Sequence, residues 1–200
     1  MIGAVVLAAG VSSRLGVPKQ LLVYRGRPML AVVVENLLKS PVDQVVVVLG
    51  HRADEVAVVL AGYRVEVVVN GAYSAGQATS LKAGLAALGG SVRAALFALG
   101  DQPLVKPQTI RLLVEQYKTS GGIVAPFFRG VRGNPVIFDR RFWPEINSLE
   151  GDVGAREVIQ KHPERLHRVD VADRGVLIDI DTWEDYRRFL NKKGDRACAR

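Results

Sequence analysis

Small and positively charged residues follow the first apolar segment of the chain. The stretch reads Leu7-Ala8-Ala9-Gly10-Val11-Ser12-Ser13-Arg14-Leu15-Gly16-Val17-Pro18-Lys19. Its small residues let backbone N–H groups approach a ligand closely, and its two serine hydroxyls add hydrogen-bond donors. Arg14 and Lys19 add two positive charges to the same loop. This combination predicts a cradle for a polyanion.

The loop matches neither standard phosphate-binding fingerprint. Gly10 and Gly16 are six residues apart with no glycine at the third place of a dinucleotide-binding motif, and no lysine directly follows the second glycine as a Walker A loop requires. A plain strand-to-helix turn would explain the glycines, but it would not explain why Arg14 and Lys19 occur together beside a run of small residues. We therefore favour the polyanion cradle over the plain turn.

A single carboxylate follows another apolar segment, in Leu99-Gly100-Asp101-Gln102-Pro103. Mg²⁺ is held in proteins by one or two carboxylates, with phosphate oxygens and water completing its shell. Asp101 is therefore expected to hold Mg²⁺ against the ligand of the first loop, and the alternative is that it caps the helix after Pro107. Asp179 and Asp181 supply two more carboxylates, and this pair is expected to add a metal ligand, with either residue as the candidate. Thr182 and Asp185 are spaced as a capping box.

Three further polar segments are candidates for binding. Residues 70–80, from Asn70 through Gly76 to Ser80, either close over a base and ribose or form an ordinary loop with a helix N-cap, and the residues alone leave both open. The segments 130–135 and 151–156 are rich in glycine and charge. The three histidines are scattered and show no zinc-ligand spacing.

Alternating strand and helix patterns must position these loops. Short apolar runs typical of a buried parallel sheet occur at residues 5–7, 45–49, 65–69, 94–99 and 123–125, with later strands at 136–138 and 177–178. Helical spacing occurs between them, at residues 29–38 and 110–117, and again at 142–146 and 155–160. This order predicts an α/β fold with a central parallel sheet, whose ligand crevice lies at the carboxyl ends of the strands.

Length and charge limit the possible classes. The 200 residues fit one domain, which we expect at residues 1–191. The net charge is 27 − 20 = +7, but residues 187–200 hold six basic residues and one acid, so they contribute +5 and the rest only +2. We therefore expect a basic, frayed tail at residues 192–200 and neither a nucleic-acid nor a membrane partner. The one cysteine, Cys198, excludes an internal disulfide and suits the cytoplasm.

The order of these motifs resembles the MobA-like nucleotidyltransferases, and within them the molybdenum cofactor cytidylyltransferases. The resemblance covers nearly all of residues 2–190. It implies a Rossmann-like, three-layer nucleotidyltransferase domain with a central, mostly parallel sheet, Mg²⁺ as cofactor, and catalytic roles for Arg14, Lys19 and Asp101. The implied nucleotide-binding residues are Leu7, Ala8, Ala9, Gly10, Ser12, Ser13, Arg14, Lys19, Asn70, Gly76, Ser80 and Gly100. The implied acceptor-binding residues are Gly133, Asn134, Pro135, Asp152, Arg156 and Asp179, and the implied metal ligands are Asp101 and Asp181.

The resemblance also implies a reaction, in which CMP passes from CTP to the terminal phosphate of a molybdopterin-type acceptor and pyrophosphate is released. A molybdoenzyme or its maturation chaperone is the implied protein partner. Ala9 stands where guanylyl-transferring relatives usually carry glycine, which favours CTP, and Asn134 stands where the cofactor branch usually has histidine. The alternatives are guanylyl transfer, transfer to a different phosphorylated acceptor, and a nucleotide-binding module without catalysis.

Overall fold

The computed structural model describes residues 1–191. Its elements follow in the order β1 (Ile2–Ala8), β2 (Val23–Tyr24), β3 (Arg27–Pro28), α1 (Met29–Leu38), β4 (Gln44–Leu49), α2 (Ala53–Ala57), β5 (Glu66–Val69), α3 (Gln77–Ala87), β6 (Ala94–Leu99), α4 (Pro107–Ser120), β7 (Ile123–Phe128), β8 (Val131–Arg132), β9 (Val136–Asp139), α5 (Trp143–Ser148), α6 (Arg156–Lys161), β10 (Leu166–Asp170) and α7 (Trp183–Asn191). The expected tail at residues 192–200 lies outside the described residues.

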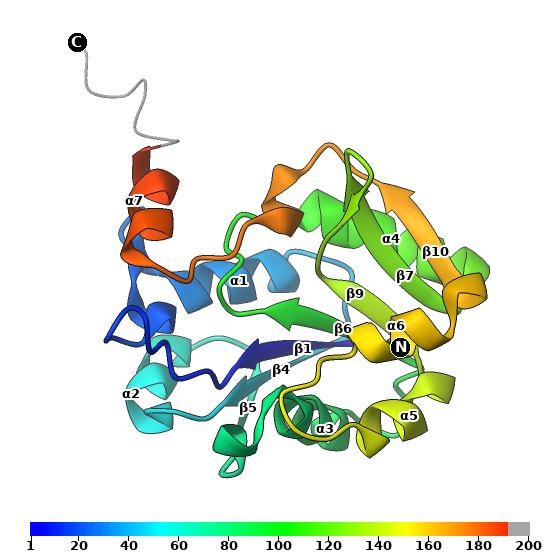
Figure 1. The fold of residues 1–200 in the computed structure, drawn as a ribbon, viewed down its shortest axis with the longest axis horizontal. Coiled ribbons are helices and arrows are strands. Elements are labelled where there is room, and N and C mark those ends of the chain that lie inside the picture. The colour runs from blue at the N-terminus through cyan, green and yellow to red at the C-terminus, as the bar shows by residue number, and fades with distance from the viewer. Residues whose placement is uncertain (192–200) are drawn as a thin grey trace.

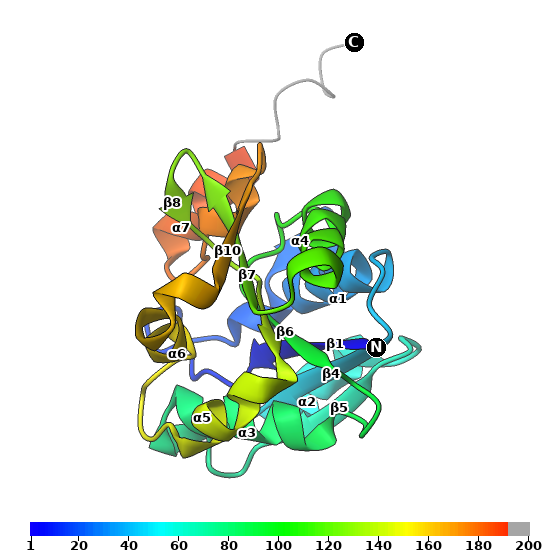
Figure 2. The same cartoon turned by 90° about the vertical axis from the view of Figure 1, so that its right-hand side faces the viewer.

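One mixed sheet organises the fold, in the order β10-β7-β9-β6-β1-β4-β5 with β8 paired to β7. Strands β6, β1, β4 and β5 run parallel, whereas β9 pairs antiparallel to both β6 and β7. Helices cover both faces, with α1 and α4 on one side and α3 and α5 on the other (Figure 1, Figure 2). The predicted Rossmann-like, mostly parallel three-layer architecture is confirmed.

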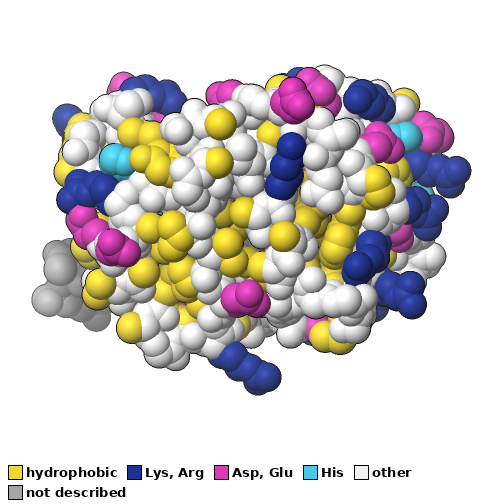
Figure 3. Space-filling model, turned by 90° about the horizontal axis from the view of Figure 1, so that it is seen from below, with side chains coloured by type: hydrophobic (Ala, Val, Ile, Leu, Met, Phe, Trp, Pro, Cys, Tyr) yellow, Lys and Arg dark blue, Asp and Glu magenta, His cyan; other side chains and the backbone are white. Residues whose placement is uncertain are grey.

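Two apolar layers hold the helices to the sheet. Side chains of β1 alternate between them, since Ala4 and Val6 join the layer under α1 and α4, and Val5 joins the layer under α3 and α5. A third cluster packs α7 against α1 and the β2–β3 hairpin through Phe189, Ile180 and Met29. Apolar side chains occupy much of the middle of the face seen in Figure 3, and most charged side chains lie toward its rim.

The expected strand at residues 177–178 is wrong. The chain forms a 3-10 turn at Arg174–Leu177, because the buried carboxylate of Asp173 accepts a hydrogen bond from the Gly175 amide at 3.0 Å and so caps the turn. The other oxygen of Asp173 accepts bonds from the Lys106 amide and the Thr109 hydroxyl at 2.8 and 2.7 Å. Asp173 therefore also holds the start of α4.

Strand β10 was not expected from the sequence. Its residues include His167, Arg168 and Asp170, and its side chains are only partly buried or exposed. As the edge strand next to β7, it needs neither the continuous apolar run nor the clean alternation that reveals the other strands.

The close packing of α3 on β1 gives the first testable prediction. A Cβ added at Gly84 would lie 2.2 Å from Cγ1 of Val5, and such overpacking costs about 1–3 kcal/mol. Alanine gains about 1 kcal/mol over glycine in a helix interior. We expect Gly84→Ala to lower the free energy of unfolding in urea, despite this gain in helix propensity.

The matched control is Ala86→Gly at an exposed position of the same helix, which should lose about 1 kcal/mol through propensity alone. The contrary result is that Gly84→Ala raises the free energy of unfolding by about as much as Ala86→Gly lowers it. Helix propensity alone would then determine the stability of Gly84→Ala, and the close approach of α3 to β1 would carry no cost.

Candidate active site

The carboxyl ends of β1 and β6 lie side by side and bring the first loop next to Asp101. These strands are parallel neighbours, with Leu7 opposite Leu99. Each therefore releases its following loop at the same edge of the sheet, which is why two motifs some 80 residues apart in sequence meet. Asp101 does not cap α4, since Lys106 occupies the N-cap position of that helix.

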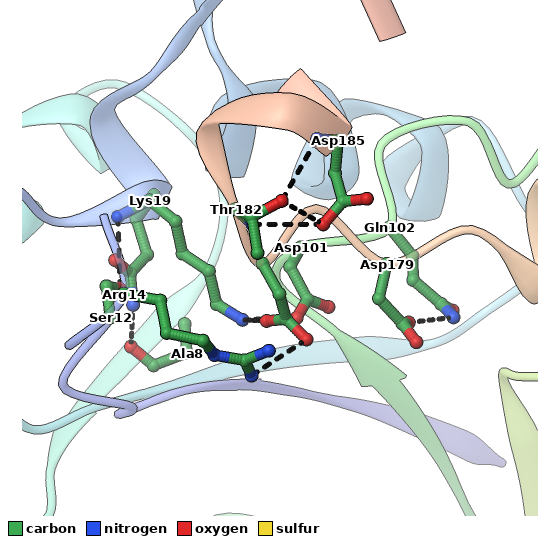
Figure 4. A network of polar contacts seen from close by, with 11 residues as sticks. Ala8, Ser12, Arg14, Lys19, Asp101, Gln102, Asp179, Thr182 and Asp185 are labelled. Atoms are coloured by element: carbon green, nitrogen blue, oxygen red, sulfur yellow. Dashed lines mark hydrogen bonds and ion pairs between the residues drawn. The ribbon is translucent and has the colours of Figure 1, made fainter. Parts of the chain in front are cut away.

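Lys19 forms one cluster with the two expected metal ligands, Asp101 and Asp181, and Figure 4 shows the side chains of Lys19 and Asp101 meeting. The Lys19 ammonium donates to Oδ2 of Asp101 in a short contact and to Oδ1 of Asp181 at 2.8 Å. Arg14 lies 3.4 Å from the other oxygen of Asp181 and is largely exposed. The four groups thus balance two negative charges with two positive charges at the end of the sheet.

Burial determines the charge states in this cluster. Burial raises the pKa of Asp101 above its ordinary value, and the Lys19 ammonium acts in the opposite direction. Burial alone would lower the pKa of Lys19, but the carboxylates of Asp101 and Asp181 raise it above its ordinary value. The Lys19 ammonium therefore opposes the effect of burial and favours the ionised form of Asp101.

The segment 179–181 reaches the cluster through contacts with residues 101 and 102. The Ile180 amide donates to the Asp101 carbonyl at 3.3 Å, and the Gln102 side chain donates to Asp179 at 2.7 Å. The Ile180 side chain is fully buried and so anchors the segment beside the cluster, where Asp181 accepts its bond from Lys19.

The predicted capping box is confirmed. The Thr182 amide donates to Oδ2 of Asp185 at 3.0 Å, and the Thr182 hydroxyl oxygen accepts from the Asp185 amide at 3.1 Å. These bonds fix the start of α7 directly after Asp181, and the Thr182 hydroxyl lowers the pKa of Asp185.

A cavity of about 840 Å³ opens beside this cluster. Of the residues expected from sequence it is lined by Leu7, Ala8, Ala9, Gly10, Arg14, Lys19, Gly76, Ser80, Gly100, Asp101, Asp152 and Asp181. The first loop, the start of α3 and the end of β6 therefore share one concave surface. Its size suits a nucleotide-sized ligand.

The start of α3 is held at the cavity by a distant loop. Helix α3 begins at Gln77, so Ser80 lies within the helix and is not its N-cap. Gly76 has φ of 110°, and a Cβ there would lie 2.1 Å from the backbone carbon of Gly151. This close crossing requires glycine, and it lets the Asp152 carboxylate accept a hydrogen bond from the Gln77 amide at 3.3 Å.

Three expected nucleotide-binding residues, Ser12, Ser13 and Asn70, do not line the cavity, and two of them support the loops. The Ser12 hydroxyl accepts a hydrogen bond from the Lys19 amide at 3.2 Å, and Ser13 is exposed. The buried Asn70 donates to Thr79 and Ser80 at 2.8 and 3.0 Å. These bonds shape the first loop and the start of α3.

The expected acceptor-binding residues are not brought together. Asp152 lines the main cavity, whereas Asp179 lines a second hollow of about 370 Å³ that shares Arg14 and Asp181 with it. Residues 133–135 lie at neither of these two sites. A Cβ at Gly133 would lie 2.4 Å from the Val176 carbonyl, which also accepts from the Asn134 amide, so this segment serves a close chain crossing. Arg156 starts α6 and lines neither hollow.

Gln20 lines the cavity although no sequence pattern selects it. Its side chain is 1% exposed and donates to the Ala8 carbonyl at 2.7 Å. Gln20 therefore ties the end of the first loop back to its beginning. Tyr73 and Gln77 also line the cavity, and both lie within the candidate segment 70–80. For Gln20 the only available signal is its place directly after Lys19.

Comparison with known proteins places this site in a family. Residues 4–167 match the model of the MobA-like NTP transferase domain. The chain belongs to this family of nucleotidyltransferases. None of the helices of this protein within residues 1–191 has the length and apolar character needed to cross a membrane.

Individual relatives carry different names. Nicotine blue oxidoreductase of Paenarthrobacter nicotinovorans is 34% identical, over 93% of this chain and 95% of the relative. Molybdenum cofactor cytidylyltransferase of Escherichia coli K12 is 23% identical, over 92% of this chain and 93% of the relative.

A solved structure supports the same fold. Rv0371c of Mycobacterium tuberculosis H37Rv is 35% identical with a TM-score of 0.83, covering 95% of this chain and 97% of that one. The same protein was also solved in complex with manganese, a structure that is 34% identical with a TM-score of 0.80 and covers 95% of this chain and 98% of that one.

The contact between Gln20 and Ala8 gives a prediction. Gln20→Met keeps the length of the side chain but removes the donor, which leaves the Ala8 carbonyl without this partner. Such a loss costs about 1–3 kcal/mol. We expect a lower free energy of unfolding in urea and, because the loop loses its tie, about ten-fold weaker binding of a nucleoside triphosphate in equilibrium dialysis.

The control is Gln160→Met at an exposed position of α6, which should change stability by no more than about 0.5 kcal/mol. Equal behaviour of the two variants in both measurements would show that Gln20 does not hold the loop.

Proposed function

We propose that this protein transfers CMP from CTP to the terminal phosphate of a molybdopterin-type acceptor in the cytoplasm and releases pyrophosphate. The observation that carries the proposal is the convergence of Lys19 and Arg14 with Asp101 and Asp181 on one nucleotide-sized cavity. Cations beside carboxylates are what a triphosphate and its metal ion require, and this chemistry needs no nucleophilic side chain.

The triphosphate is proposed to lie along the first loop. Gly10 lines the cavity and a Cβ there would meet no atom of the protein within 4 Å, so the loop borders open space that phosphate oxygens can fill. Arg14 and Lys19 then neutralise phosphate charge, and the start of α3 with Ser80 forms the wall for the nucleoside. The carboxylate of Asp152 at this helix start argues for a sugar or base there and against phosphate.

The proposed reaction is an in-line displacement at the α-phosphorus. An oxygen of the acceptor phosphate forms a bond to the α-phosphorus while the bond from that phosphorus to the oxygen bridging the β-phosphate breaks. Pyrophosphate leaves with that oxygen and its negative charge. Lys19 and Arg14 attract the charge that accumulates on the leaving group, and the cavity walls hold the two reactants in line.

Mg²⁺ fits the carboxylates of this site. Oδ1 of Asp101 is buried and has no hydrogen-bond partner among the described residues, so it can bind a cation, and Asp181 lies on the other side of the Lys19 ammonium. Within residues 1–191 no group of three or more His, Cys, Asp or Glu side chains gathers as a metal site. Two carboxylates are enough for Mg²⁺ when phosphates complete its shell, and the ion supplies charge neutralisation on the triphosphate.

The acceptor is proposed to enter beside Asp152 and Asp179, which border the two hollows that share Arg14 and Asp181. An acceptor phosphate at this shared wall meets Arg14 directly. Arg156 and the segment 133–135 would contact only a larger part of the acceptor. A molybdoenzyme or its maturation chaperone is the proposed recipient of the product.

The test is to mix the purified protein with Mg²⁺, molybdopterin and each of the four nucleoside triphosphates in turn, and to measure pyrophosphate. CTP is expected to give the fastest release of pyrophosphate, and mass spectrometry is expected to show a cytidylylated product. Release with another triphosphate only would change the nucleotide assignment, and no release with any of the four would contradict nucleotidyl transfer to this acceptor.

A second candidate rests on the 34% identity to a protein named nicotine blue oxidoreductase. An oxidoreductase reaction would require a redox partner, and NADH and NADPH are the obvious probes. One arm of the same experiment therefore mixes the protein with the acceptor and either NADH or NADPH. The absorbance of the NADH or NADPH is then followed. Oxidation of NADH or NADPH without pyrophosphate release would favour this candidate.

The role of Asp101 gives a prediction. Asp101→Asn keeps the shape of the side chain but removes its negative charge, so the site loses its attraction for Mg²⁺. Because a metal contributes several kcal/mol to such transition states and each 1.36 kcal/mol changes a rate ten-fold, we expect turnover to fall about 100-fold or more. The thermal midpoint should change little, and Asp170→Asn on the exposed edge strand serves as the control. Turnover within a few-fold of the parent protein would remove Asp101 from the site.

Nucleotide choice gives another prediction. Ala9 lines the cavity and is nearly buried, so its methyl group reduces the room available for a base. One methyl group changes discrimination by about 1–3 kcal/mol. We expect Ala9→Gly to narrow the preference for CTP over GTP without reversing it, measured by competing the two nucleotides at equal concentration. Ala172→Gly, outside the cavity, is the control, and a mainly guanylylated product from the parent protein would contradict the choice of CTP.

A further inference from the structure

The ammonium group of Lys19 lies between the two carboxylates that are proposed to hold a divalent ion. It donates to Oδ2 of Asp101 and, at 2.8 Å, to Oδ1 of Asp181. The Lys19 side chain is 17% exposed and that of Asp101 is 13% exposed, so water screens this contact poorly. Figure 4 shows the Lys19 side chain extended toward Asp101. The Lys19 ammonium is thus a cation that already bridges Asp101 and Asp181.

Oδ1 of Asp101 has no hydrogen-bond partner among the described residues, but it offers a divalent ion one oxygen only, and an ion that bridges Asp101 and Asp181 must use the side of the two carboxylates where the ammonium now lies. Mg²⁺ binds carboxylate oxygens at about 2.0–2.1 Å, closer than an ammonium nitrogen approaches them. A divalent ion shared by Asp101 and Asp181 would occupy the space of the Lys19 ammonium and repel its charge. Metal entry between these carboxylates therefore requires Lys19 to move away.

Without a bound nucleotide, no group among the described residues draws Lys19 elsewhere. Its ammonium makes hydrogen bonds within residues 1–191 only to Asp101 and Asp181, and leaving them would strand a mostly buried positive charge. A triphosphate on the first loop changes this balance, because its oxygens offer Lys19 new anionic partners in the adjoining cavity. The carboxylates then become available to the metal.

We propose that Lys19 occupies the divalent-cation position of the nucleotide-free protein and releases it when a nucleoside triphosphate binds. This inference rests on the proposed function in that the triphosphate must bind in the main cavity. It makes nucleotide binding and metal binding mutually favourable, by the same factor in each direction. The free protein therefore binds divalent ions weakly between Asp101 and Asp181, and the ion enters with or after the nucleotide.

The first test measures Mn²⁺ affinity in the absence of nucleotide, from the electron paramagnetic resonance signal of free Mn²⁺. Lys19→Met vacates the position and should raise Mn²⁺ affinity at least ten-fold over the parent protein. Lys19→Arg keeps a cation there and should leave the affinity low. Arg14→Met removes the same charge from the same cluster without vacating the bridge, since Arg14 lies 3.4 Å from the outer oxygen of Asp181. It should change the affinity by no more than a few-fold.

A rise in Mn²⁺ affinity of equal size in Lys19→Met and Arg14→Met would overturn the proposal, because the effect would then be general electrostatics. No rise in Lys19→Met would overturn it as well. Circular dichroism and the thermal midpoint establish that each variant is folded before its titration is interpreted.

The second test follows the Lys19 ammonium group by nuclear magnetic resonance and needs one variant to assign its resonance. In protein labelled with ¹⁵N-lysine, the Lys19 ammonium resonance is assigned by its loss in Lys19→Arg. Mg²⁺ alone should leave this resonance in place, whereas CTP in the presence of EDTA should shift it. Displacement by Mg²⁺ alone, or bound CTP that leaves the resonance unmoved, would overturn the proposal. Absence of CTP binding in equilibrium dialysis would instead contradict the proposed function, and the Mn²⁺ titrations would still decide whether Lys19 occupies the metal position.

Discussion

A carboxylate buried at the end of a parallel strand needs a cation beside it, and the rest of this site depends on that requirement. Asp101 follows β6 at the edge of the sheet where burial disfavours its charge, and Lys19 supplies the counter-charge from the loop after β1. The two elements can meet because β1 and β6 are parallel neighbours. The first loop must therefore fold so that Lys19 returns to the strand ends, and Ser12 and Gln20 provide the hydrogen bonds that make it do so.

The remaining elements of the site complete a surface around this ion pair. Residues 179–181 bring a second carboxylate because Ile180 is buried and its amide bonds to the Asp101 carbonyl. The loop at Gly151 and Asp152 crosses Gly76 at the start of α3 and thereby closes the opposite wall of the cavity. Each contact joins segments far apart in the sequence, so the cavity forms only once the sheet has been assembled. Its alternating cations and carboxylates suit a nucleoside triphosphate. The family to which the chain belongs is one of NTP transferases.

Much of the fold and part of the site can be predicted because they depend on local patterns. Apolar runs identify the central strands, and the rule that ligands bind at the carboxyl ends of parallel strands is enough to predict that Lys19 and Asp101 share one site. Sequence reasoning cannot find Gln20, whose function lies in one bond to the Ala8 carbonyl, because a glutamine carries no pattern of its own. Sequence reasoning also interprets Gly133-Asn134-Pro135 as a binding loop, and it gives no sign that Gly133 is needed where the chain crosses Val176. Close crossings and ligand loops both select glycine and polar residues, so the residue types alone do not separate them.

A crystal structure with CTP and Mn²⁺ would show whether a triphosphate binds between the first loop and Asp101. The anomalous scattering of manganese locates the ion independently of the nucleotide. We expect manganese at the oxygens of Asp101 and Asp181, the triphosphate along residues 10–19, and the Lys19 ammonium on phosphate oxygens. A nucleotide bound elsewhere, or manganese bound away from Asp101 with Lys19 still between the two carboxylates, would contradict this arrangement.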